Sequence, residues 1–143
     1  MATIQTTYLG DLRTEATHLQ SGTRLLTDAP TDNNGRGEAF SPTDLVAGAL
    51  GSCMMTIMGI AARRDGIDLT GSVMSITKVM SSEGPRRIVR IEVNLTMQTT
   101  DELPEDARLK LERAARTCPV ALSLHPDVEQ AVSFVWQPAN VLH

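Results

Sequence analysis

Residues 41–64 read SPTDLVAGALGSCMMTIMGIAARR, and this stretch decides the fold. Cys53 lies in the middle of a run, residues 45–62, that carries no charge. A helix of this length and composition could nearly cross a membrane, but the run contains several glycine, serine and threonine residues and nothing else in the chain is as apolar. A helix that is apolar on all sides is also typical of the buried centre of a domain. We therefore predict a buried central helix and no membrane insertion.

The ends of this helix are marked by local signals. Ser41 is a good N-cap, Pro42 suits the first helical position, and Asp44 stands three residues after the cap. At the other end, basic residues up to Arg64 favour the helix C-terminus and Gly66 ends the helix. The pattern predicts one helix from Pro42 to about Arg64.

The bulk composition excludes several classes of protein. With 143 residues, 41% of them hydrophobic and 21% charged, the chain has the length and composition of one globular domain, residues 1–143. A net charge of −4 without a long basic run argues against nucleic acid as a partner. The N-terminus does not resemble a signal peptide, so we expect a cytoplasmic protein.

The remaining segments predict an α+β fold with antiparallel sheet. Residues 1–27 contain short alternating stretches that predict two or three strands, and residues 28–40 are rich in loop-forming Asp, Asn, Gly and Pro. Residues 87–97, RIVRIEVNLTM, alternate as a half-buried strand should. A helix is predicted from about Pro104, because six residues share one face: Leu103, Ala107, Leu111, Ala114, Ala115 and Cys118. A short helix from Pro119 and a last strand, AVSFVW, complete the order.

The chain has two cysteines, Cys53 and Cys118, separated by 65 positions. This spacing fits neither a Cys-x-x-Cys redox motif nor a zinc ribbon, so any partnership must come from the fold. Each cysteine alone is explained as a small buried hydrophobic residue. However, Cys118 directly precedes Pro119 at a predicted helix start, where the helix dipole would stabilise a thiolate.

The two cysteine contexts together resemble a known family. SPTDLVAGALGSC, followed some 65 residues later by CPVALSLHPDV, is similar to osmotically inducible protein C and the organic hydroperoxide reductases, in particular to the less characterised OsmC-like branch. The resemblance covers nearly the whole chain. It implies an α+β fold in which antiparallel sheets wrap around a long central helix, an intertwined homodimer, and chemistry without flavin, haem or metal.

The resemblance also implies a mechanism. Cys53 would attack a small organic hydroperoxide and become a sulfenic acid, and Cys118 would condense with it to a disulfide that an external dithiol reduces. An apolar pocket lined by residues such as Met54, Ile57 and Met58 would favour organic hydroperoxides over hydrogen peroxide.

The polar part of the family site differs in this chain. Well-characterised members carry a glutamate ten residues before the first cysteine and an arginine that holds the thiolate, whereas Thr43 stands at the glutamate position here. Arg36 and Glu38, in the loop before the helix, are our candidates for these roles. Arg24 and Arg13 are alternative cations.

Other functions compete with the peroxidase. His18, His125 and His143 could join the cysteines in a metal site, but their spacing is irregular and LHPD favours a turn or cap role for His125. No nucleophile-elbow pattern supports a hydrolase. The main alternative is a redox-sensing or small-molecule-binding dimer that uses the same pocket without turnover.

Overall fold

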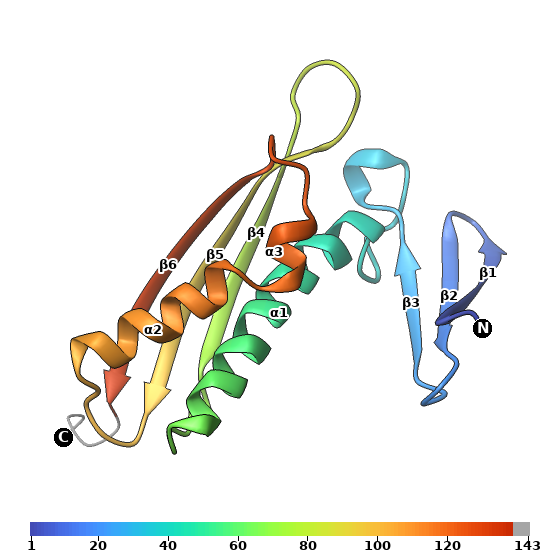
Figure 1. The fold of residues 1–143 in the computed structure, drawn as a ribbon. Helices are drawn as coiled ribbons and strands as arrows, with labels where there is room; N and C mark the ends of the chain where they lie inside the picture. The colour runs from blue at the N-terminus through green and yellow to red at the C-terminus, as the bar shows by residue number, and fades with distance from the viewer. Residues whose placement is uncertain (139–143) are drawn as a thin grey trace. The chain divides into compact units, whose positions relative to one another are not determined.

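The computed structural model describes residues 1–138, and their contacts group them into two units, residues 1–46 and the residues from 47 on. The elements follow one another as shown in Figure 1: β1 (Ile4–Gly10), β2 (Arg13–His18), β3 (Arg24–Asp28), a 3-10 turn (Thr31–Asn33), α1 (Pro42–Arg64), β4 (Val73–Met80), β5 (Ile88–Thr99), α2 (Glu105–Arg116), α3 (Pro119–Ser123) and β6 (Glu129–Pro138). The predicted α+β fold is confirmed.

The N-terminal unit is a sheet of three antiparallel strands in the order β1-β2-β3. Its buried residues are polar, namely Thr27, Asp28 and Ser41, and no hydrophobic residue among residues 1–46 is fully buried. Large hydrophobic residues of this sheet, such as Ile4, Tyr8 and Leu25, are exposed, and a sheet that buries no apolar face is not independently stable. This unit therefore depends on packing against further protein surface.

Asp28 is the main cross-link inside the N-terminal unit. Its Oδ2 accepts hydrogen bonds from the backbone N–H of Glu38 at 3.0 Å and from Arg13 Nη2 at 3.3 Å, while Oδ1 is buried without a partner. The N–H of Glu38, the most important of these contacts, and the Arg13 charge hold the pKa of Asp28 below its usual range. The carboxylate thus ties the loop before α1 to two strands.

The signals at the ends of α1 act as predicted. Ser41 and Asp44 form a reciprocal capping box, with Ser41 N–H donating to Asp44 Oδ2 at 2.9 Å and Asp44 N–H donating to Ser41 Oγ at 3.0 Å. At the C-terminus, Gly66 takes a positive φ of 69° and Ile67 N–H donates to Ala62 O at 2.8 Å. Glycine adopts this conformation without steric cost, so the helix ends where the sequence indicates.

The second unit contains the sheet β4-β5-β6, and its helices lie on one face of that sheet (Figure 1). The central strand β5 buries the alternate residues Ile91, Val93, Leu95 and Met97, as the sequence pattern predicts. The β4–β5 hairpin is antiparallel, but β6 runs parallel to β5, which corrects the expectation of a purely antiparallel sheet. The connection through α2 and α3 returns the chain to the starting end of β5, and such a crossover makes a strand pair parallel.

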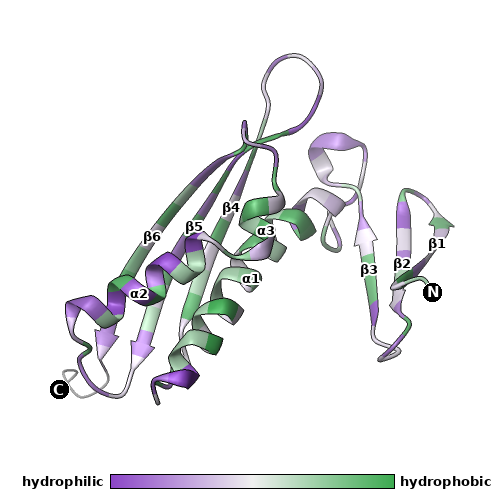
Figure 2. Ribbon diagram, viewed as in Figure 1, coloured by the Kyte–Doolittle hydropathy of each residue, from purple (hydrophilic) through white to green (hydrophobic). Residues whose placement is uncertain are grey.

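Helix α1 packs on this sheet with one face only. Leu50, Met54 and Met58, each four residues apart, are fully buried, and a Cβ on Gly51 would lie 2.4 Å from Ile76 Cδ1. Figure 2 shows hydrophobic residues along most of the helix and a hydrophilic C-terminal end. By length and composition alone, α1 could also cross a membrane. Of its most apolar 18 residues, 33% are buried within the described part of the chain. The expected central helix is thus buried on one side.

Replacement of Leu111 by alanine should test the core on α2. Leu111 is 1% exposed and Leu109, two residues earlier on the same helix, is 43% exposed. Loss of a buried leucine side chain costs about 2–5 kcal/mol because a cavity remains. We expect urea denaturation to show a loss in this range for Leu111→Ala and less than about 1 kcal/mol for the control Leu109→Ala. Equal losses would contradict this core assignment.

The stability of the protein should depend on the charge of Asp28. Because the folded-state pKa of Asp28 lies below the unfolded value, its contribution is present above the unfolded pKa and disappears as the pH falls through the folded pKa. Between pH 7 and pH 3 the wild type should therefore lose more stability than Asp28→Asn. Thermal unfolding across this range measures the difference, with Asp11→Asn, which removes an exposed carboxylate from the same unit, as control. Parallel pH profiles for the wild type and Asp28→Asn would argue against this role.

Candidate active site

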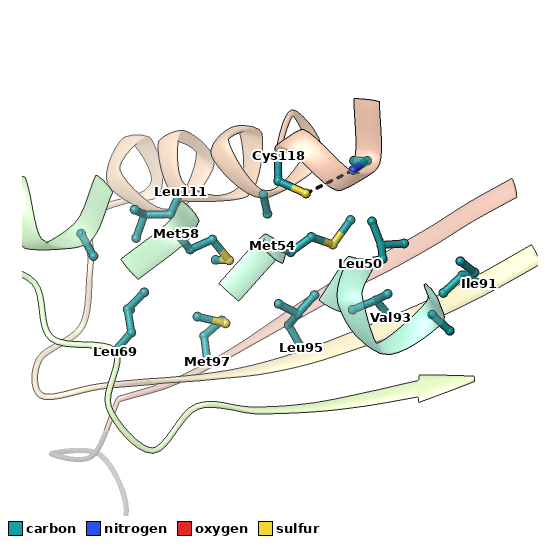
Figure 3. Close-up of a cluster of buried hydrophobic side chains, with 14 residues drawn as sticks. Leu50, Met54, Met58, Leu69, Ile91, Val93, Leu95, Met97, Leu111 and Cys118 are labelled. Atoms are coloured by element: carbon teal, nitrogen blue, oxygen red, sulfur yellow. Dashed lines mark hydrogen bonds between the residues drawn. The ribbon is translucent and has the colours of Figure 1, made fainter. Parts of the chain in front are cut away.

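Cys118 is held at the junction of α2 and α3. It is the N-cap of α3, and its Sγ accepts a hydrogen bond from the N–H of Ala121 at 3.4 Å, drawn as a dashed line in Figure 3. Pro119 begins the helix, as predicted. The side chain of Cys118 is fully buried and belongs to the hydrophobic core.

The fold brings Cys53 and Cys118 together. Both are free thiols, and Cys53, on α1, lies near enough to Cys118 to affect the pKa of its thiol. Burial raises the pKa of the Cys118 thiol, the N–H of Ala121 opposes this effect, and the neighbouring Cys53 side chain raises the pKa further. The expectation that a helix dipole makes Cys118 acidic is therefore wrong, because loss of hydration outweighs the effect of a helix of one turn and a half.

The environments of the two thiols differ in a way that matters for chemistry. Cys53 is half-buried, whereas Cys118 is buried and its thiol form is favoured. A thiol that meets an external oxidant must be reachable, while a thiol that closes a disulfide needs only to lie beside the first. The arrangement suits Cys53 as the attacking sulfur and Cys118 as the resolving sulfur.

The methionines near the pair belong to the core. Figure 3 shows Met54 and Met58 of α1 between α2 and β5, among Leu111, Leu95 and Met97. We expected Met54, Ile57 and Met58 to line an open pocket, but both methionines are fully buried. Ile57 is half-buried. Substrate selection by Met54 and Met58 would thus act through packing of the helix.

The predicted polar residues lie in the N-terminal unit. Glu38 forms an ion pair with Arg13, which also contacts Asp28, while Arg36 is exposed in the same loop. Thr43 Oγ1 lies 3.2 Å from Ser41 Oγ at the start of α1. The sequence reading missed Asp28 because an acidic residue before Ala-Pro looks like a turn residue and nothing local reveals its burial.

Of the histidines that we considered as metal ligands, His18 ends β2 and His125 lies in the connection between α3 and β6. His18 Nδ1 lies 2.6 Å from Ser21 Oγ, and His125 Nδ1 accepts the N–H of Asp127 at 3.0 Å. Within residues 1–138, no group of three His, Cys, Asp or Glu side chains is arranged to hold a metal ion. His143 lies outside the described residues.

Comparison with known proteins gives a family and a fold. Residues 35–132 match the family model described as OsmC-like protein. A proposed osmotic stress induced and detoxification response protein from Psychrobacter arcticus 273-4 is 49% identical, with 94% of this chain and 96% of that chain aligned and a TM-score of 0.88. The comparison with curated protein sequences finds no match.

More distant structures share the fold. An OsmC-like protein from Mycoplasma pneumoniae is 15% identical over 93% of this chain and 94% of that chain, with a TM-score of 0.75. An organic hydroperoxide resistance protein OsmC from Legionella pneumophila is 18% identical over 94% of this chain and 98% of that chain, with a TM-score of 0.68. Because the family model covers well over half of the sequence, the chain belongs to the OsmC-like protein family.

Proposed function

We propose that this protein reduces organic hydroperoxides through a dithiol–disulfide cycle of Cys53 and Cys118. The observation that carries the proposal is the proximity of a half-buried and a buried thiol that come from distant parts of the chain. A pair kept only for packing does not require one accessible member. The proposal takes hydroperoxide as the substrate because the chain shares its family and fold with proteins named for resistance to organic hydroperoxides.

The cycle consists of three balanced steps. The Cys53 thiolate attacks the outer peroxide oxygen, the O–O bond breaks, and Cys53 becomes a sulfenic acid while the alkoxide takes a proton to form an alcohol. The Cys118 thiol then condenses with the sulfenic acid, which forms the S–S bond and releases water. An external dithiol finally reduces the disulfide and is itself oxidised, and a reducing compartment such as the cytoplasm would supply it.

The proposal also includes a cation that favours the Cys53 thiolate. Arg36 and Glu38 stay our predictions for the polar roles. Within the N-terminal unit, Arg13 is oriented by both Asp28 and Glu38, and it stays an alternative cation. An oriented guanidinium can hold a thiolate with less loss of side-chain entropy.

A redox sensor is the second candidate function. Thr43 stands where well-characterised relatives carry glutamate, and its hydroxyl lies beside Ser41 at the start of α1. Without that carboxylate the pair could react once and signal its oxidation instead of turning over. Steady-state consumption of cumene hydroperoxide with dithiothreitol or dihydrolipoamide separates the two, because an enzyme consumes many equivalents and a sensor consumes one.

One equivalent of cumene hydroperoxide should oxidise both thiols of the wild type. We expect thiol counting to show the loss of two thiols, and intact mass to fall by two hydrogens, as an intramolecular disulfide requires. Cys118→Ser should stop at a sulfenic acid on Cys53, which dimedone traps, and Cys53→Ser should keep its remaining thiol.

The two single variants serve as matched controls, because each removes one sulfur atom and preserves the size of the side chain. Dimedone labelling of Cys118 in the Cys53→Ser variant would reverse the assigned order. Loss of thiols with a doubled mass would indicate an intermolecular disulfide in place of the proposed pair.

We also propose that the protein is a homodimer. On α1, Val46 and Ile60 are exposed, and Ile60 lines an open hollow of about 830 Å³. Residues 1–46 expose further large hydrophobic residues, among them Ile4, Tyr8, Leu25 and Phe40. Apolar surface of this extent needs a cover. The family resemblance supports a second copy of the chain as that cover.

The mass in solution should be twice the 15.5 kDa of the chain. A charge placed at Ile60, which is 47% exposed, would be buried in the dimer, so Ile60→Lys should weaken association. Val135→Lys introduces the same charge on the opposite face of the β4-β5-β6 sheet and should leave the dimer intact. Light scattering after size exclusion measures both. A monomeric wild type at micromolar concentration would refute the proposal.

A further inference from the structure

We infer that Gln130 is a positioning residue for Cys118. The inference rests on the proposed dithiol cycle and adds to it the side chain that holds the resolving sulfur in place. Gln130 lies on β6, twelve residues after Cys118, and its side chain donates a hydrogen bond to the backbone of α3. Its influence passes through a single residue of α3.

Gln130 is an unexpected residue for its place in the sheet. Alternate residues of a strand face the same side, and on β6 the other residues of this face, Val132, Phe134 and Trp136, pack against the hydrophobic core. Gln130 is half-buried in the same row. An amide on an apolar face needs a hydrogen-bond partner, and its partner here is the backbone of α3.

The contact reaches Cys118 in two short steps. Gln130 Nε2 donates a hydrogen bond to the carbonyl oxygen of Ala121 at 3.0 Å, and the N–H of the same Ala121 donates to Cys118 Sγ at 3.4 Å. Near the end of so short a helix, a carbonyl has no partner within the helix. Gln130 supplies that partner, and it thereby holds the residue whose own N–H donates to the sulfur.

Helix α3 has little stability of its own. It contains five residues, its Leu122 side chain is 72% exposed, and Ala121 is its one fully buried residue. Isolated helices of this length do not persist in water. The helix that caps Cys118 therefore depends on contacts with the sheet.

The rest of the helical segment is tied to β6 in the same register. The Arg116 guanidinium lies 5.4 Å from the ring centre of Phe134, and Trp136 Nε1 donates to Glu112 Oε2 at 3.1 Å. The three contacts join Glu112 to Trp136, Arg116 to Phe134 and Ala121 to Gln130. The helical segment and β6 therefore run in opposite directions along this row of contacts. In the sequence, Cys118 lies between Arg116 and Ala121, which contact Phe134 and Gln130. The hydrogen bond of Gln130 is the contact on the α3 side of Cys118.

Position matters because the second step of the cycle joins two sulfurs. A disulfide requires an S–S distance of about 2.0 Å and a narrow range of dihedral angles. Cys53 and Cys118 are neighbouring free thiols, so their sulfurs must approach each other to close the disulfide. An anchored α3 keeps this motion short, whereas a released α3 would let Cys118 sample positions out of reach of Cys53.

Gln130→Leu and Gln137→Leu form a matched pair for the test. Both replace a glutamine by leucine on β6, but Gln137 is exposed on the opposite face. Titration with reduced and oxidised dithiothreitol measures how readily Cys53 and Cys118 close, since oxidised dithiothreitol takes the two electrons and two protons of the dithiol without any peroxide. Single-turnover reaction with cumene hydroperoxide then follows the loss of the first and second thiol separately.

We expect Gln130→Leu to lower the equilibrium constant for disulfide formation about three- to tenfold, the effect of one lost hydrogen bond. Gln137→Leu should stay within about twofold of the wild type. With peroxide, Gln130→Leu should lose its first thiol at the wild-type rate and its second more slowly, with more sulfenic acid trapped by dimedone. A general loss of structure would slow or speed both steps together. If Gln130→Leu does not fold, Gln130→Asn keeps the amide on a side chain one methylene shorter, and the same direction is expected.

The outcomes separate this inference from the proposed function. Equal equilibrium constants for Gln130→Leu and Gln137→Leu would overturn the role of Gln130 even where peroxide oxidises the wild-type pair. An increased equilibrium constant would also overturn it, since Gln130 would then hold the sulfurs apart. A wild type that ignores peroxide, together with a lowered constant in Gln130→Leu, would support the positioning role and reject the peroxidase.

Discussion

Packing of α1 against the β4-β5-β6 sheet is the constraint on which the second unit depends. Leu50, Met54 and Met58 recur every four residues and meet the buried row of β5, so the rotation of α1 about its axis is fixed. Cys53 directly precedes Met54 and is therefore held near the edge of the buried face, where it contacts Cys118. The same packing sets the core and the access of the reactive sulfur, so a shift of α1 would change both.

The N-terminal unit follows a different logic. It has no hydrophobic core, and the positions it does bury hold Thr27, Asp28 and Ser41. Burying a carboxylate beside an arginine seldom stabilises a fold more than apolar packing would. The N-terminal unit keeps the Arg13–Asp28 ion pair although it has no apolar core. The pair is therefore better explained by the orientation it gives to the Arg13 side chain than by a gain in folding stability.

The sequence predicts those features whose signals are local. Ser41, Pro42 and Gly66 set the ends of α1, and the alternation of residues 87–97 identifies the buried row of β5, because capping and strand periodicity act over a few residues. The direction of β6 and the pairing of Arg13 with Asp28 depend instead on contacts between residues far apart in the chain. The cysteine partnership is an intermediate case, since the family resemblance implies it and spacing alone does not.

The order of the two thiols shows how competing effects are weighed. A helix N-terminus stabilises a thiolate through free N–H groups and the dipole, but α3 has five residues and offers Cys118 one side-chain hydrogen bond of 3.4 Å. Complete burial removes the hydration of a charged sulfur, which is the larger effect and raises the pKa of Cys118. Cys118 does not need to ionise before the peroxide reacts, since it enters only after Cys53 has become a sulfenic acid, whose oxygen then leaves as water with the Cys118 proton. Burial of Cys118 therefore fits the resolving role, and the half-buried position of Cys53 leaves it to meet the oxidant.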